Sequence, residues 1–134
     1  DVYKRQDMPM NHKVFLAQFD AIKKLASEGP CVMVGRCADY ALSEYKDCFS
    51  VFVHADTDWR INRLSQKHNK TAKEAKAMIN KTDKSRSSYY NYYTNKKWGS
   101  ADSYNLCLDS SKLGIDGTAK AIIEAIHIYD SLKK

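Results

Sequence analysis

Arginines, whose guanidinium groups bind phosphate, occur in two closely spaced pairs, one with a second arginine and one with an aspartate. Arg60 and Arg63 are three residues apart, and Asp83 and Arg86 repeat that spacing, which places each pair on one face of a helix. A guanidinium binds a phosphate through two parallel hydrogen bonds, whereas a lysine acts as a point charge. The arginines therefore indicate an anion site, although Asp83 and Arg86 taken alone are better explained as a surface ion pair.

The segment from Arg60 to Lys97 carries the basic excess of the whole chain. It holds eleven Lys and Arg residues against Glu74 and Asp83, a net charge of +9 in a protein whose total is +6. A solvated helical face explains most of these lysines, but the same charge suits the phosphates of a small ligand or of a nucleic acid. The tyrosines within Tyr89–Tyr93 could stack on bases or pack against a sheet.

Length and composition narrow the class of protein. A chain of 134 residues with 43% hydrophobic and 28% charged residues is typical of one globular domain. No apolar run approaches the roughly 20 residues of a membrane helix, so we expect no membrane partner. The four cysteines show no metal-ligand spacing, and we expect them to be reduced in a cytoplasmic protein without a metal site.

Apolar patterning predicts the elements of the first third of the chain. An amphipathic helix should end at Glu28–Pro30, where Gly29 supplies a left-handed cap. The continuous apolar run Cys31–Val34 then predicts a strand buried on both faces, and a short helix is expected over Ala38–Glu44. Phe49–Val53 is rich in β-branched and aromatic residues, so it predicts a second strand.

Capping signals predict two helices in the middle of the chain. Asp56 or Thr57 can cap a helix that fades near His68–Asn69. Thr71–Glu74 is a capping box, which predicts the start of a long helix that runs toward Tyr93.

The last third of the chain completes an alternation of strands and helices. Tyr104–Leu108 predicts a third strand, and a C-terminal amphipathic helix follows Gly114–Asp116. The alternation favours an α/β fold with a mostly parallel sheet, in which ligands bind beyond the carboxyl ends of the strands. Those ends are Gly35–Asp39, His54–Asp56 and Asp109–Ser111.

Taken in order along the chain, several segments resemble the cytidylate kinase-like family. The resemblance covers about residues 13–126 and rests on the ordered set rather than on any single motif. The segments that carry it are Val34–Tyr40, Val51–Asp56, Arg60–Leu64, Asp83–Tyr90, Tyr92–Thr94, Trp98–Gly99, Tyr104–Ser110 and Leu113–Asp116.

The resemblance implies part of the parallel sheet of the P-loop nucleoside monophosphate kinases, flanked by helices. It implies an enzyme that transfers a phosphoryl group from ATP, with Mg²⁺, to CMP, dCMP or a similar acceptor. A basic helical lid would span about residues 58–98. Within it, Arg60 and Arg63 would be the catalytic residues, contacting ATP or the transferred group.

By the same resemblance, four residues would bind the acceptor nucleotide. Arg36 matches an arginine after the family's third strand, while Asp83 and Arg86 match an Asp-x-x-Arg that contacts the sugar and phosphate. Cys37 stands where the family has an aspartate, which leaves the acceptor base open, and Asp39 is the candidate carboxylate nearby.

The sequence contains no Gly-x-x-x-x-Gly-Lys-Ser/Thr, the family's phosphate-binding loop. In the family's fold, the first strand carries this loop and lies centrally, between the strands expected at Cys31–Val34 and Phe49–Val53. We therefore expect residues 1–134 to be a single partial kinase-like domain, lacking its central strand and inactive alone. The alternative is a basic module that binds nucleic acid or nucleotides without catalysis.

Overall fold

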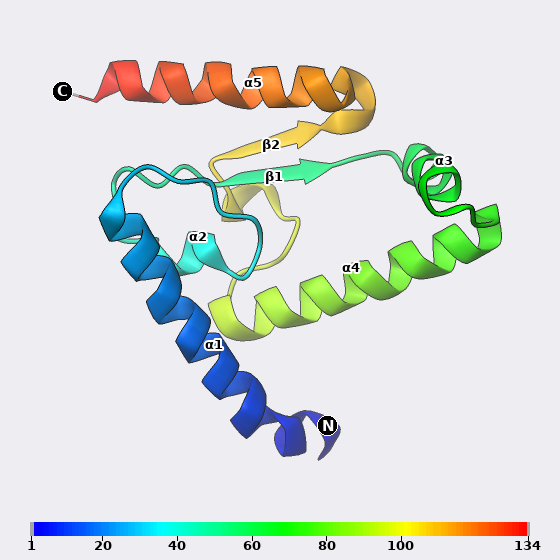
Figure 1. Cartoon of the computed structure of the whole chain (residues 1–134), viewed down its shortest axis with the longest axis horizontal. Helices are drawn as coiled ribbons and strands as arrows, with labels where there is room; N and C mark the ends of the chain where they lie inside the picture. The colour runs from blue at the N-terminus through cyan, green and yellow to red at the C-terminus, as the bar shows by residue number, and fades with distance from the viewer. Residues whose placement is uncertain (1, 134) are drawn as a thin grey trace. The chain divides into compact units, whose positions relative to one another are not determined.

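A computed structural model describes the backbone of residues 2–133 and the side chains of residues 12–133 (Figure 1). The chain divides into two compact units, Asp1–Cys48 and Phe49–Lys134, each considered by itself below. The expected single domain, with its lid over about residues 58–98, stays a prediction. Within residues 2–133, no helix combines the length and the apolar composition needed to cross a membrane.

The first unit consists of a long helix and a short one. Helix α1 (Val2–Glu28) ends where its Gly-Pro stop signal predicts, and α2 (Ala38–Ala41) is shorter than expected. Ile22 of α1 packs with Ala41 and Leu42 in a small buried cluster. The two helices are therefore held together by apolar contacts.

The strand predicted over Cys31–Val34 is wrong. No strand forms there, and the side chains of Val32 and Val34 are 94% and 89% exposed instead of buried. Cys31 is also exposed, contrary to its expected place in a core. A strand requires pairing of its N–H and C=O groups with a neighbouring strand. The ladder formed by the described residues joins two other segments, so this apolar run has no pairing to order it.

The second unit contains a two-stranded parallel sheet, which confirms the predicted α/β class. Strand β1 (Val51–His54) pairs with β2 (Leu106–Asp109) in a register that places His54 opposite Asp109. Just before both strands, the side chain of Asn105 accepts hydrogen bonds from the Ser50 backbone N–H and hydroxyl, each at 2.9 Å. These two hydrogen bonds help to fix the register of the two strands, so that their carboxyl ends are aligned. The missing central strand stays a prediction.

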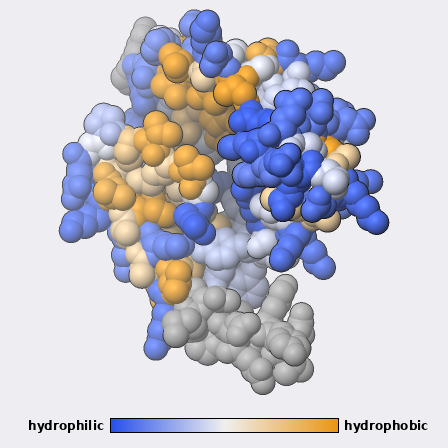
Figure 2. Space-filling view, turned by 45° about the vertical axis from the view of Figure 1, so that its right-hand side comes forward, coloured by the Kyte–Doolittle hydropathy of each residue, from blue (hydrophilic) through white to orange (hydrophobic). Residues whose placement is uncertain are grey.

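Two helices follow β1, and their predicted caps are confirmed. Helix α3 (Thr57–His68) begins where the Asp56 carboxylate accepts a 3.2 Å hydrogen bond from the backbone N–H of Trp59. Helix α4 (Ala72–Thr94) begins with the capping box formed by Thr71 and Glu74. The two helices pack against each other, and their outer surface is hydrophilic (Figure 2).

Helix α5 (Ser110–Leu132) follows β2 and runs along one side of the sheet (Figure 1). Gly114 interrupts its helical geometry with a φ of 72°, a left-handed conformation that glycine adopts without strain. The Tyr129 ring lies 5.4 Å from that of Phe49, just ahead of β1. Phe52 of β1 instead packs against the segment between α4 and β2, which includes the short 3-10 helix η1 (Ala101–Ser103).

Candidate functional site

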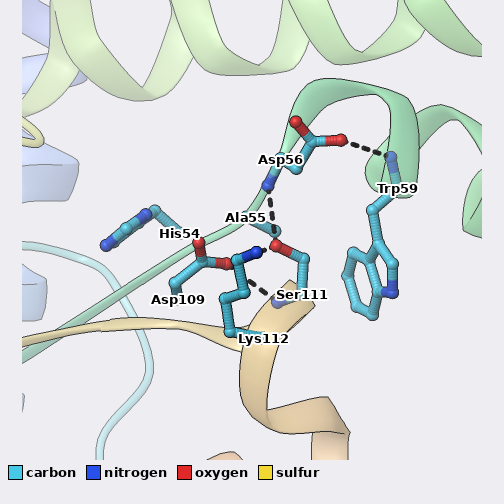
Figure 3. A pocket seen from close by; sticks show the side chains of 7 residues that line it. All are labelled: His54, Ala55, Asp56, Trp59, Asp109, Ser111 and Lys112. Carbon is cyan, nitrogen blue, oxygen red and sulfur yellow. Dashed lines mark hydrogen bonds between the residues drawn. The ribbon is translucent and has the colours of Figure 1, made fainter.

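An open pocket of about 470 Å³ lies at the carboxyl ends of β1 and β2 (Figure 3). Its volume is within the range of small-molecule sites, and its position is the one expected for ligands of a parallel sheet. Two of the three predicted strand ends therefore meet at one pocket. The lining residues are His54, Ala55, Asp56, Trp59, Asp109, Ser111 and Lys112.

Ser111 ties the two strand ends together. Its hydroxyl accepts a 3.2 Å hydrogen bond from the backbone N–H of Asp56 and donates one to the Asp109 carboxylate. The same carboxylate accepts a 2.9 Å bond from the Ser111 backbone N–H. Figure 3 shows these bonds running across the pocket from β2 to the start of α3. One of these bonds, between Asp56 and Ser111, joins residues 55 positions apart and so links the ends of the two strands.

The pocket carries charges of both signs. Hydrogen bonding from the Ser111 hydroxyl, supported by the Ser111 backbone N–H, lowers the pKa of the Asp109 carboxyl. Asp109 therefore remains an anion at neutral pH. Lys112 supplies a cation on the same lining, and Trp59 supplies an aromatic face. Such a combination suits a ligand with both a planar ring and a charged group.

Arg63 lies beside this pocket through its contact with Trp59. The centre of its guanidinium is 5.7 Å from the centroid of the indole ring, a cation–π distance, and the side chain is exposed. Trp59 and Lys112 line the pocket but were not among the predicted site residues. Their positions, each within three residues of a predicted strand-end segment, are the signal that could have identified them.

Arg60 faces a different partner, Asp83 of α4. Its two Nη atoms donate hydrogen bonds to the two carboxylate oxygens at 2.8 and 2.7 Å, and the side chains are 30% and 26% exposed. The hydrogen bond with Asp83 raises the pKa of Arg60. The structure thus joins a predicted catalytic residue to a predicted acceptor-binding residue, and Asp83 pairs with Arg60 rather than with Arg86.

Arg86 lies on the same face of α4 as Asp83. The two residues are three apart, and the buried Ile79 and Tyr90 continue that face at helical spacing. Arg86 nevertheless remains exposed. Between the buried Ile79 and Tyr90, this face of α4 therefore presents the Asp83 carboxylate, which pairs with Arg60, and the exposed guanidinium of Arg86.

Arg36 and Asp39 belong to the first unit, described separately from the residues above. Arg36 is exposed on the turn before α2 and has a φ of 57°, as does the following Cys37. Cys37 is buried, and burial together with the nearby Asp39 raises the pKa of its thiol to about 11. A thiol in this state is a poor nucleophile. The roles expected for Arg36 and Asp39 stay predictions.

Across the part of the chain with described side chains, no cluster of three His, Cys, Asp or Glu residues is suited to a metal ion. The pocket's two carboxylates, Asp56 and Asp109, are each engaged in capping a helix.

Comparison with known proteins identifies relatives of the chain. A sequence profile of the cytidylate kinase-like family matches residues 1–112. A solved structure of an uncharacterized protein from Eubacterium ventriosum ATCC 27560 is similar, with 32% sequence identity and a TM-score of 0.83. The similarity covers 87% of this chain and 74% of that one. No protein with a curated description matches.

Proposed function

Because the chain belongs to the cytidylate kinase-like family, we propose that it takes part in phosphoryl transfer from ATP to CMP, dCMP or a similar acceptor. One observation carries the proposal beyond the family match. The Arg60–Asp83 ion pair connects the helix that holds both candidate phosphoryl-binding arginines to the helix that holds Asp83 and Arg86. Donor-side and acceptor-side candidates thus come from adjoining helices.

The arginines of α3 supply what phosphoryl transfer requires. The transferred group spreads negative charge over its oxygens, and catalysis consists largely of positioning and of cations placed near that charge. Arg63 is exposed beside the strand-end pocket, so its guanidinium is available to a ligand. In this proposal Arg63 contacts the phosphates of a nucleotide whose ring lies against Trp59.

Asp83 and Arg86 serve the acceptor in this proposal. A carboxylate accepts hydrogen bonds from ribose hydroxyls, and a guanidinium binds the monophosphate in bidentate fashion. Both side chains lie on one face of α4. For Arg36 and Asp39, in the first unit, acceptor binding stays the role that the family resemblance implies.

ATP and Mg²⁺ are the cofactors that this proposal implies. The pocket's aromatic face and lysine suit a nucleotide, but the sequence holds no glycine-rich loop that would cradle the phosphates of ATP. Mg²⁺ characteristically binds through substrate phosphates and waters with few protein ligands. The proposal therefore assigns no residue of this chain to the metal.

Trp59 and Trp98 form a matched pair of probes for this proposal. Trp59 lines the pocket, whereas Trp98 packs its ring 5.3 Å from that of Phe52. In ¹H–¹⁵N spectra of the 134-residue chain, titration with ATP or with CMP is expected to shift the indole N–H signal of Trp59. The Trp98 signal should stay in place. Arg63→Ala should weaken the response of Trp59.

A lack of response by Trp59 would contradict the proposal. If neither nucleotide moves the Trp59 signal at millimolar concentration, the pocket is not a nucleotide site. Binding of RNA that weakens steeply with salt would then favour the non-catalytic nucleic-acid module.

A further inference from the structure

The Arg60–Asp83 ion pair has a consequence for ligand binding. We infer that Asp83 is an internal competitor for Arg60: its carboxylate holds the guanidinium edge that a phosphate needs, and an anionic ligand must take that edge over. The inference rests on the proposed function in one respect, because it takes phosphate to be the ligand of Arg60.

The geometry of the pair makes the competition direct. Both Nη atoms of Arg60 donate to Asp83, at 2.8 and 2.7 Å. Phosphate and carboxylate are bound by arginine in the same fork-like manner. A phosphate that used both Nη atoms in this way would have to replace Asp83.

The released carboxylate has another cation within reach. Arg86 lies three residues further along the same face of α4 and is exposed, and residues at this spacing form ion pairs on helices. A ribose hydroxyl of an acceptor could also donate to Asp83. Exchange of partners therefore leaves no charge buried alone.

The strength of the pair is compatible with such an exchange. With side chains 30% and 26% exposed, the pair resembles a surface salt bridge, and such salt bridges contribute little to the free energy of folding. A polyphosphate carries several negative charges against the single charge of Asp83. It therefore has the electrostatic advantage needed to displace the carboxylate.

The test measures the affinity of inorganic tripolyphosphate for the 134-residue chain by calorimetry. Asp83→Asn is expected to raise that affinity about fivefold, the value of an exposed ion pair expressed as an equilibrium constant. Asp58→Asn is the matched control, since it makes the same charge change on α3 at a carboxylate that is exposed. The gain should disappear when Arg60→Ala is added to Asp83→Asn.

A second measurement uses the unmodified chain and does not depend on how the variants fold. Tripolyphosphate is expected to shift the carboxylate ¹³C signal of Asp83 while the signal of Asp58 stays in place. Equal affinities for the two asparagine variants, or weaker binding by Asp83→Asn, would overturn the inference. So would a failure of both the unmodified chain and Asp83→Asn to bind tripolyphosphate.

The inference and the proposed function fail in different ways. If Asp83→Asn binds tripolyphosphate more tightly but no nucleotide is ever phosphorylated, the inference about Asp83 holds and the kinase proposal fails. If nucleotides shift the Trp59 signal but Asp83→Asn behaves like Asp58→Asn, the nucleotide site stands and the competitor is wrong.

Discussion

Arg60 and Arg63 are three residues apart on one helix, yet the structure gives them different surroundings. Arg60 is fixed at the junction of α3 and α4 by two hydrogen bonds to Asp83. Arg63 is exposed and rests against Trp59 at the edge of the strand-end pocket. The first arginine is engaged by the protein itself, and the second is open to a ligand. Residue type and spacing alone therefore do not distinguish an arginine that is held by a neighbouring helix from one that is open to a ligand.

The largest expected effect is on phosphoryl transfer. In the protein as its gene encodes it, Arg63→Ala should lower kcat/KM about 100-fold, the usual loss on removal of one group that stabilises transition-state charge. The free energy of unfolding should change by less than about 0.5 kcal/mol, because the side chain is exposed. Steady-state kinetics and thermal melts measure the two quantities. Lys67→Ala, which removes another exposed cation of α3, should leave both unchanged.

The second prediction concerns Arg60, where we expect the larger effect on the stability of the fold. Arg60→Ala should lower the free energy of unfolding by about 1–2 kcal/mol, because it leaves the Asp83 carboxylate partly buried without its partner. Adding Asp83→Ala should recover part of that loss, since both charges are then gone. A denaturant titration of the two variants and Arg63→Ala checks this. Equal losses for Arg60→Ala and Arg63→Ala would remove the distinction between the two arginines.

The third prediction concerns the start of α4, which carries Asp83. Thr71→Ala should cost about 1 kcal/mol at pH 7 through loss of the helix cap. Hydrogen bonding to Thr71 lowers the pKa of Glu74 below its ordinary 4.5. Its contribution is therefore complete above that ordinary value and disappears as the pH falls through the lowered pKa. Because the backbone N–H of residue 71 still donates to Glu74 in Thr71→Ala, Glu74→Gln tests the carboxylate. The cost of Glu74→Gln should be smaller at pH 3 than at pH 7, and a cost that grew on acidification would contradict the cap.

The smallest expected effect is at the pocket. Ser111→Ala should raise the pKa of Asp109 toward its ordinary value, because the Ser111 hydroxyl is the main cause of its lowering. An NMR titration of the Asp109 carboxylate measures the change. Ser131→Ala, far along α5 and bonded to its own helix, should leave that pKa alone. An unchanged pKa in Ser111→Ala would contradict the hydrogen bond from the Ser111 hydroxyl to the Asp109 carboxylate.

The sequence predicts those parts of the fold that depend on local contacts. The caps at Asp56 and Thr71 act on backbone groups within three residues, so both helix starts were predictable. The apolar runs 31–34 and 106–108 look alike in sequence, but only the second has a neighbouring strand in the described ladder. Strand formation depends on a distant partner, and this explains the wrong prediction for the first run.

In the candidate site, too, features set by local sequence were predictable and a contact between distant residues was not. The rule that ligands bind at strand ends identified the pocket's segments His54–Asp56 and Asp109–Ser111. It could not show that Arg60 pairs with Asp83, 23 residues away, because that contact depends on how α3 packs on α4. Sequence spacing instead suggested Asp83 with Arg86.

Phosphoryl transfer from ATP is the most direct measurement of the central claim. It should be measured with the protein as its gene encodes it, across CMP, dCMP, UMP, AMP and GMP, with Arg36→Ala and Arg63→Ala as variants. The proposal predicts turnover with a pyrimidine nucleotide, reduced in both variants. Absence of turnover with every nucleotide, from protein that is folded, would contradict it.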